Sequence, residues 1–216
     1  MYEEIAKNNR NTIILLVGFV VFIIFLGWLF GEIFFGGLGY AGIILAAIIA
    51  IVFAFFGYFY SDKIVLSISG AREVKKEEYP YLFNLIDGLA TAAGIPKPKA
   101  YVINDTALNA FATGRDPEHS VIVATTGILQ KLDRQELEGV IAHEMSHIKN
   151  YDIRLMTLTV VFVGLVALLS DIMLRSFLWG GGNRDREANR LSIILVIVGI
   201  VFAIISKCND LALLNL

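Results

Sequence analysis

The sequence predicts a membrane α-helical protein that carries a small α+β domain between hydrophobic segments. Three observations support this fold class. Of the 216 residues, 56% are hydrophobic and only 18% are charged. The mean hydropathy of +0.69 is far above the range of a soluble globular domain. Long uncharged runs fill most of the first 60 residues, whereas polar residues are concentrated between residues 61 and 154.

Two N-terminal runs, residues 12–30 and 38–60, are each predicted to span the bilayer. Neither contains a charged residue, and a 19-residue helix at ~1.5 Å per residue nearly covers a hydrocarbon core of ~30 Å. We expect them to form a transmembrane hairpin within residues 1–60. Eleven lysines and arginines lie in residues 61–154 and none lies in the hairpin link. Because positive residues favour the cytoplasmic side, residues 61–154 are predicted to face the cytoplasm in a multi-pass membrane protein.

A second hydrophobic hairpin is predicted in residues 155–207, followed by a short tail at residues 208–216. Its two apolar runs, residues 155–170 and 191–206, are each slightly short of the ~20 residues that a perpendicular span needs. The link between them also holds three arginines. The hairpin therefore either crosses the bilayer against the charge bias or is re-entrant and buried in protein.

Charge and cysteine content exclude several classes of function. The formal net charge is −2 and the sequence pI is near 5.9, so no nucleic-acid partner is expected. The single cysteine, Cys208, has no companion for an internal disulfide or a thiolate metal site. Chemistry must therefore come from histidine and carboxylate side chains.

The polar segment, residues 61–154, has the pattern of a small α+β domain. Pro80 marks the start of an amphipathic helix that Gly94 ends. The stretches "KAYVIND", "ALNAFATG" and "SVIVATTG" are rich in β-formers and separated by turn residues, which predicts an antiparallel meander. A further helix follows, with Asp133 as its N-cap, Glu136 at the third helical position and Asn150 at its end.

That last helix contains the motif His143, Glu144, His147. Histidines four residues apart lie within ~40° of one helix face, so both imidazoles can converge on one zinc ion. A zinc-activated water has a pKa near ~7, and Glu144 is placed to take its proton as general base in peptide hydrolysis. The other explanation is a pair of surface histidines. We favour a metal site because uncharged flanking residues predict that the motif is buried, namely Val140, Ile141, Ala142, Met145 and Ile148.

Two other polar residues have open or ordinary explanations. Asp152 follows the second histidine by five residues and either supports that ligand through a hydrogen bond or caps the next segment. His119 follows Pro117 and Glu118, and we interpret it as a solvated turn residue.

Together these segments resemble the HtpX family of membrane-embedded zinc metalloproteases and, more distantly, the CAAX prenyl proteases. The resemblance rests on the two N-terminal spans, "GIPKPKAYVI", "NAFATGRDPEHSVIVATTGIL", "ELEGVIAHEMSHIKNYD" and the later apolar runs. It implies a zincin-like domain, with the motif helix beside a small antiparallel sheet and one zinc ion per chain held by His143 and His147. It also implies that Glu144 is the catalytic base.

The same resemblance implies the substrates and the residues that hold them. The expected function is endoproteolysis, in the cytoplasmic membrane, of misfolded or damaged membrane proteins during stress, as part of protein quality control. Residues 109–114, starting with Asn109, Ala110, Phe111 and Ala112, would be an edge strand that binds an extended substrate through its main chain. From spacing alone, an ordinary strand without this role is an equally open alternative. The oligomeric state is not predicted.

The sequence departs from the family pattern at the third zinc ligand. The family supplies a glutamate after the fourth apolar run, but no glutamate follows Glu187 and the nearest carboxylate is Asp210. Three hypotheses follow: an active protease completed by Asp210 or by a partner chain, a truncated inactive fragment or pseudoprotease, and a structural or transport membrane protein with an incidental motif.

Overall fold

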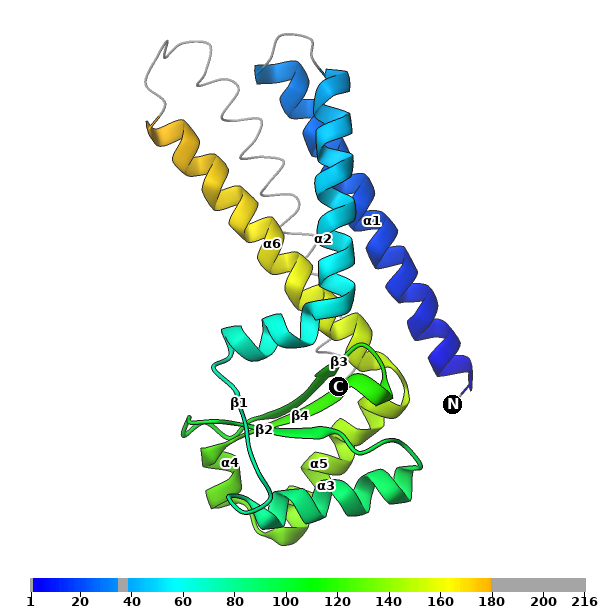
Figure 1. Ribbon diagram of the computed structural model, residues 1–216, viewed down its shortest axis with the longest axis vertical. Coiled ribbons are helices and arrows are strands. Elements are labelled where there is room, and N and C mark those ends of the chain that lie inside the picture. Colours follow the sequence, from blue (N-terminus) through cyan, green and yellow to red (C-terminus); the bar gives the residue numbers. More distant parts are fainter. Residues whose placement is uncertain (1, 35–38, 180–216) are drawn as a thin grey trace.

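The computed structural model describes residues 2–34 and 39–179, which form a bundle of long helices above a small α+β domain (Figure 1). In chain order the elements are α1 (Tyr2–Phe34), α2 (Gly39–Ile68), β1 (Arg72–Glu73), α3 (Pro80–Ala93), β2 (Lys99–Ile103), β3 (Ala110–Gly114), a 3₁₀ helix (Pro117–His119), β4 (Ser120–Thr125), α4 (Thr126–Lys131), α5 (Arg134–Lys149) and α6 (Asp152–Trp179). The predicted membrane helices and the predicted α+β domain are both present.

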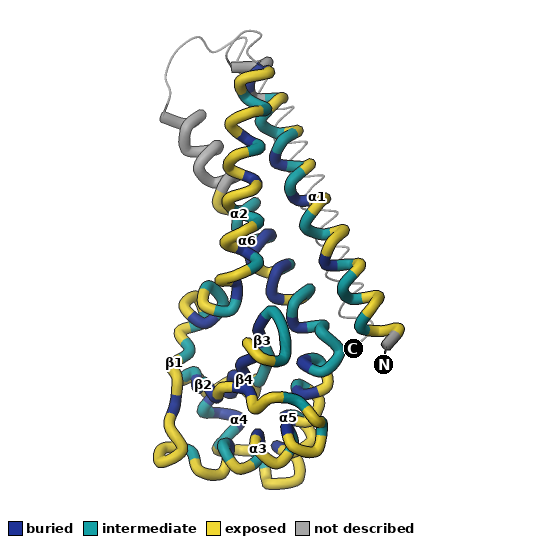
Figure 2. Tube along the Cα trace, turned by 45° about the vertical axis from the view of Figure 1, so that its right-hand side comes forward, coloured by how far each residue is buried: buried dark blue, intermediate teal, exposed yellow. Residues whose placement is uncertain are grey.

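Helices α1 and α2 lie side by side, and both are long and apolar enough to cross a membrane, over Glu3–Leu29 and Gly39–Ile68. Many large apolar residues of both helices are exposed, and yellow segments, which mark exposed residues, recur along both helices in Figure 2. Gly27 and Gly42 face each other, and a Cβ on either would collide with the backbone of the other helix. The glycines therefore allow a close helix-helix approach, as small residues do in membrane bundles.

Helix α6 contains the third apolar run and continues beyond it to Trp179. It packs against α1 through Phe162, whose ring stacks on Phe19 with centroids 4.0 Å apart. The axes of α5 and α6 differ by 87°, and the turn between them passes through Tyr151 in the left-handed region at φ 64°. The fourth run, at 191–206, and the tail at 208–216 lie outside the described residues.

The four strands form a mixed sheet in the order β1-β2-β4-β3. Strand β4 is antiparallel to β3, with Ala112 opposite Ile122, but it is parallel to β2, with Tyr101 opposite Val123. The predicted antiparallel meander is therefore wrong at the β2–β4 pair. Strand β4 enters between its two predecessors, and all six of its residues are buried, as is typical of a central strand covered on both faces.

The faces of the sheet pack on different parts of the molecule. Alternate residues of β2 and β4 contact α3 and α5 in the main core, whereas Val121 and Val123 contact Leu66 of α2 on the other face. The predicted helix signals are confirmed. Gly94 ends α3 at φ 69°, and Asp133 and Glu136 form a capping box at the start of α5. The end of α2 thus rests on the sheet, so the membrane helices and the polar domain share apolar contacts.

Candidate active site

A pocket of about 380 Å³ opens where α5, the edge strand β3 and the helices α2 and α6 meet. It contains all three residues of the predicted motif, together with residues from the other elements. The lining residues are Val65, Phe111, Ala112, Thr113, His143, Glu144, His147, Met156, Thr157 and Val160. The contributions from α2 and α6 leave no trace in the sequence, because an apolar run carries no signal that separates a pocket wall from a lipid contact.

His143 and His147 turn their Nε2 atoms toward each other, and these two atoms are 3.2 Å apart. Two imidazole nitrogens that each bind one tetrahedral zinc ion at ~2.0–2.1 Å lie roughly 3.3 Å apart. The observed separation therefore fits a shared ion. The expectation that the motif is buried is wrong for His143, which is exposed, whereas Glu144 and His147 are partly buried.

Asp152 holds His147 from the opposite side. Its Oδ2 lies 2.9 Å from His147 Nδ1, and because a carboxylate only accepts, Nδ1 carries the proton and donates it. The Nε2 lone pair of the neutral ring then faces His143. The hydrogen bond to Asp152 raises the pKa of His147, with burial acting against it. Asp152 is also the first residue of α6, so it both contacts the histidine and begins the next helix.

Glu144 lies between the helix and the edge strand. Its Oε2 accepts a hydrogen bond from the backbone N–H of Ala112 at 2.9 Å. Burial raises the pKa of the Glu144 carboxyl, while the Ala112 N–H and the two histidines act in the opposite direction. A carboxylate whose pKa is moved toward neutrality is suited to both accept and return a proton.

The segment expected to bind substrate is divided between two environments. Phe111 and Ala112 line the pocket, and β3 pairs only with β4, so its other edge is open within the described sheet. Asn109 is instead joined to Thr125, with its carbonyl accepting from the Thr125 N–H at 3.0 Å. Ala110 begins the strand and packs against the main core.

His119 lies away from the pocket, as expected for a turn residue. Its Nδ1 is 2.7 Å from Asp116 Oδ1 and its side chain is 48% exposed. Within residues 2–34 and 39–179, no three His, Cys, Asp or Glu side chains are grouped as a metal site. Asp210, the candidate third ligand, lies outside these residues.

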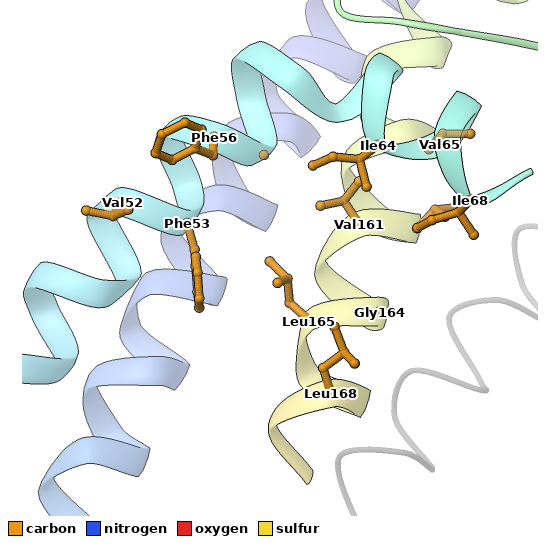
Figure 3. Close-up of a pocket in the computed structure, with 12 residues that line it drawn as sticks. Val52, Phe53, Phe56, Ile64, Val65, Ile68, Val161, Gly164, Leu165 and Leu168 are labelled. Carbon is orange, nitrogen blue, oxygen red and sulfur yellow. The ribbon is translucent and has the colours of Figure 1, made fainter. Parts of the chain in front are cut away.

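A second pocket, of about 390 Å³, lies between α2 and α6 and is lined almost entirely by apolar side chains (Figure 3). Val65 and Val160 line both pockets. The motif pocket thus adjoins an apolar space between two long helices.

Comparison with known proteins gives a consistent result. Residues 76–211 match Peptidase family M48. The chain is 47% identical to a Protease HtpX homolog of Dictyoglomus turgidum over 203 residues, which are 93% of this chain and 65% of that protein. It is 45% identical to the Dictyoglomus thermophilum homolog, covering 98% and 69%, and 40% identical to that of Listeria monocytogenes, covering 95% and 70%. The chain thus spans about two thirds of the length of these relatives. With this similarity, it belongs to the HtpX family of metalloproteases, within peptidase family M48.

Proposed function

We propose that this membrane protein is a zinc-dependent endopeptidase that cleaves misfolded or damaged membrane proteins from the cytoplasmic side of the cytoplasmic membrane. The observation that carries the proposal is the pair of imidazole Nε2 atoms 3.2 Å apart, beside a glutamate in the same pocket. Their types and spacing fit a zinc ion. The side of the membrane rests on the lysines and arginines of residues 61–154.

His143 and His147 would hold the ion, with Asp152 keeping the His147 lone pair directed toward it. When bound, zinc would polarise the scissile carbonyl and make a water molecule acidic enough to attack it. Glu144 takes the proton of the attacking water and then delivers it to the leaving amine. Burial, which raises the pKa of the Glu144 carboxyl, makes it a stronger base and so favours the first of these transfers.

The edge strand β3 supports a role in holding the substrate. An extended peptide can add to an open strand edge through main-chain hydrogen bonds, which bind many sequences alike. In this structure the Ala112 N–H at that edge donates to Glu144. The adjoining apolar pocket, which shares Val65 and Val160 with the motif pocket, suits substrates that present hydrophobic segments.

A catalytic zinc site needs a third protein ligand, and Asp210 remains our candidate. A second possibility, a pseudoprotease that folds but does not hold zinc, follows from the same need. A folded chain that binds no zinc would support it.

Cleavage of casein by the full chain in mild detergent, with zinc added, tests the proposal. Glu144→Gln keeps the shape of the side chain but removes the base, so cleavage should fall by at least ~100-fold while bound zinc is retained. The matched control is Glu138→Gln, which changes an exposed glutamate of the same helix and should cleave like wild type. Equal cleavage by the wild type and Glu144→Gln would refute the assigned role, and folded wild type without zinc or cleavage would favour the inactive alternative.

A further inference from the structure

The first membrane helix reaches the candidate active site through Asn8. Its Nδ2 donates to the carbonyl oxygen of Asn150 at 3.0 Å and also to Oδ1 of Asp152. An amide nitrogen carries two hydrogens, so one side chain can make both bonds. Figure 1 shows the lower part of α1 beside the junction of α5 and α6. The contacts join residues more than 140 positions apart in the chain.

This junction determines where His147 lies. Asn150 ends α5, Tyr151 takes a left-handed conformation, and α6 starts at Asp152. The Asp152 carboxylate binds both partners, since it accepts from Asn8 through Oδ1 and from His147 Nδ1 through Oδ2. With both oxygens bonded, the Asp152 side chain has one preferred rotation, and the imidazole follows it.

A second hydrogen bond lies next to the first, and in it the α1 asparagine accepts where Asn8 donates. Arg154 donates from Nη1 to the side-chain oxygen of Asn9 at 3.0 Å. Adjacent asparagines of α1 thus both bind this region, Asn8 as a donor to Asn150 and Asp152 and Asn9 as an acceptor from Arg154. Changing each to aspartate, which has nearly the same shape but only accepts, should therefore have different results.

We infer that Asn8 is a positioning residue for the zinc site, acting on His147 through Asp152. The first membrane helix is thereby part of the active-site support as well as an anchor. This inference rests on the proposed function, because a fixed imidazole matters most when it must bind a metal ion. Supporting residues of this kind are commonly worth 10–100-fold in metal affinity when they bond directly to the ligand.

Three aspartate variants of the full chain test the inference. Asn8→Asp places a second acceptor against Asp152 and the Asn150 carbonyl, so zinc affinity, measured by competition with a chelator, should fall by roughly 3- to 10-fold. Asn9→Asp still accepts from Arg154 and should bind zinc like wild type. Asn11→Asp is the matched control, because it adds the same charge to the same helix at a partly buried asparagine. Its side chain has no hydrogen-bond partner among residues 2–34 and 39–179.

A metal-free measurement separates this inference from the proposed function. The tautomer of His147 can be read by ¹⁵N NMR of the imidazoles, at a pH where they are neutral. The chain has three histidines, and the His147 signal is the one missing from His147→Gln. We expect the proton on Nδ1 in the wild type and in Asn11→Asp, and a loss of this preference in Asn8→Asp and Asn8→Ala. An unchanged His147 tautomer in both Asn8 variants overturns the inference, even when zinc binding is normal. If the Asn8 variants change the His147 tautomer but the wild-type chain binds no zinc, the inference about Asn8 stands and the proposed function falls.

A double-mutant cycle distinguishes positioning from simple anchoring of the helix. If Asn8 acts through Asp152, Asn8→Ala should weaken zinc binding in the wild type but have no further effect, within twofold, in Asp152→Ala. Equal losses in both backgrounds would mean that Asn8 only anchors α1 to the domain, and the inference would fall.

Discussion

Replacing Thr157 with valine is expected to destabilise the α+β domain more than the same change at its partner, Thr113. The hydroxyls of these two buried threonines are 3.0 Å apart and join α6 to the edge strand β3. Thr157 Oγ1 also accepts from the Gly114 N–H at 3.4 Å. Thr157→Val therefore leaves the buried Thr113 hydroxyl without its partner and removes the long, weak hydrogen bond from the Gly114 N–H. The expected cost is about 1–3 kcal/mol in the free energy of unfolding.

Thr113→Val should cost less, at about 1 kcal/mol or below, because the hydroxyl of a helical threonine can donate to the carbonyl four residues earlier. The double variant removes both hydroxyls of this pair, so neither is left buried without its partner. We therefore expect Thr113→Val combined with Thr157→Val to be more stable than Thr157→Val alone. The assay is urea unfolding followed by circular dichroism, in a detergent that keeps the membrane helices intact. Additive losses in the double variant would refute this account of the pair.

Three further predictions concern other parts of the chain. Gly127→Ala should cost several kcal/mol, because the new Cβ would lie on the backbone carbonyl of Thr106, and the yield of folded protein should fall. Burial alone would raise the pKa of Asp116, but hydrogen bonds from His119 lower it below its ordinary value. The stability from this carboxylate is thus fully present above a pH of ~3.9 and lost as the pH falls through the folded-state pKa. Asp116→Asn should flatten that acid limb in urea titrations, and an unchanged limb would contradict the assignment. Finally, His143→Gln should weaken zinc binding by at least ~10-fold, while His119→Gln should leave it unchanged in the chelator assay.

The elements that the sequence predicted well are those with local signals. The start of α5 follows from Asp133 and Glu136, whose side chains satisfy backbone groups within one helical turn. The end of α3 follows from Gly94, which adopts a left-handed conformation at little cost. The spacing of His143 and His147 within α5 was likewise enough to bring their Nε2 atoms together.

The sheet order was predicted wrongly because it depends on contacts that are distant in sequence. Turn residues between strands suggested that neighbours in the chain are neighbours in the sheet, but β4 lies between β2 and β3. A usable signal was present, since "SVIVAT" is almost continuously apolar, as expected for a strand covered on both faces. This run is a better indicator of the strand's central position than the turn residues on either side of it.

The burial of the motif was misjudged for a related reason. Ile141, Met145 and Ile148 recur at helical spacing and form the buried face of α5. His143 and Glu144 fall on other faces, so apolar neighbours in sequence say little about their exposure. What supports the metal site is instead the geometry across elements, with Ala112 of β3 on one side and Asp152 of α6 on the other.

Such contacts also explain why Asn8 was not recognised. An asparagine near the start of a membrane helix reads as an interfacial residue, and nothing in its neighbourhood indicates a partner beyond position 140. Only the fold brings it to Asp152, where two acceptors face its amide. A polar side chain held by acceptors on a distant element is costly to misplace. The placement of α1 against the α5–α6 bend and the orientation of His147 should therefore change together, and cleavage should be sensitive to changes in the membrane helix.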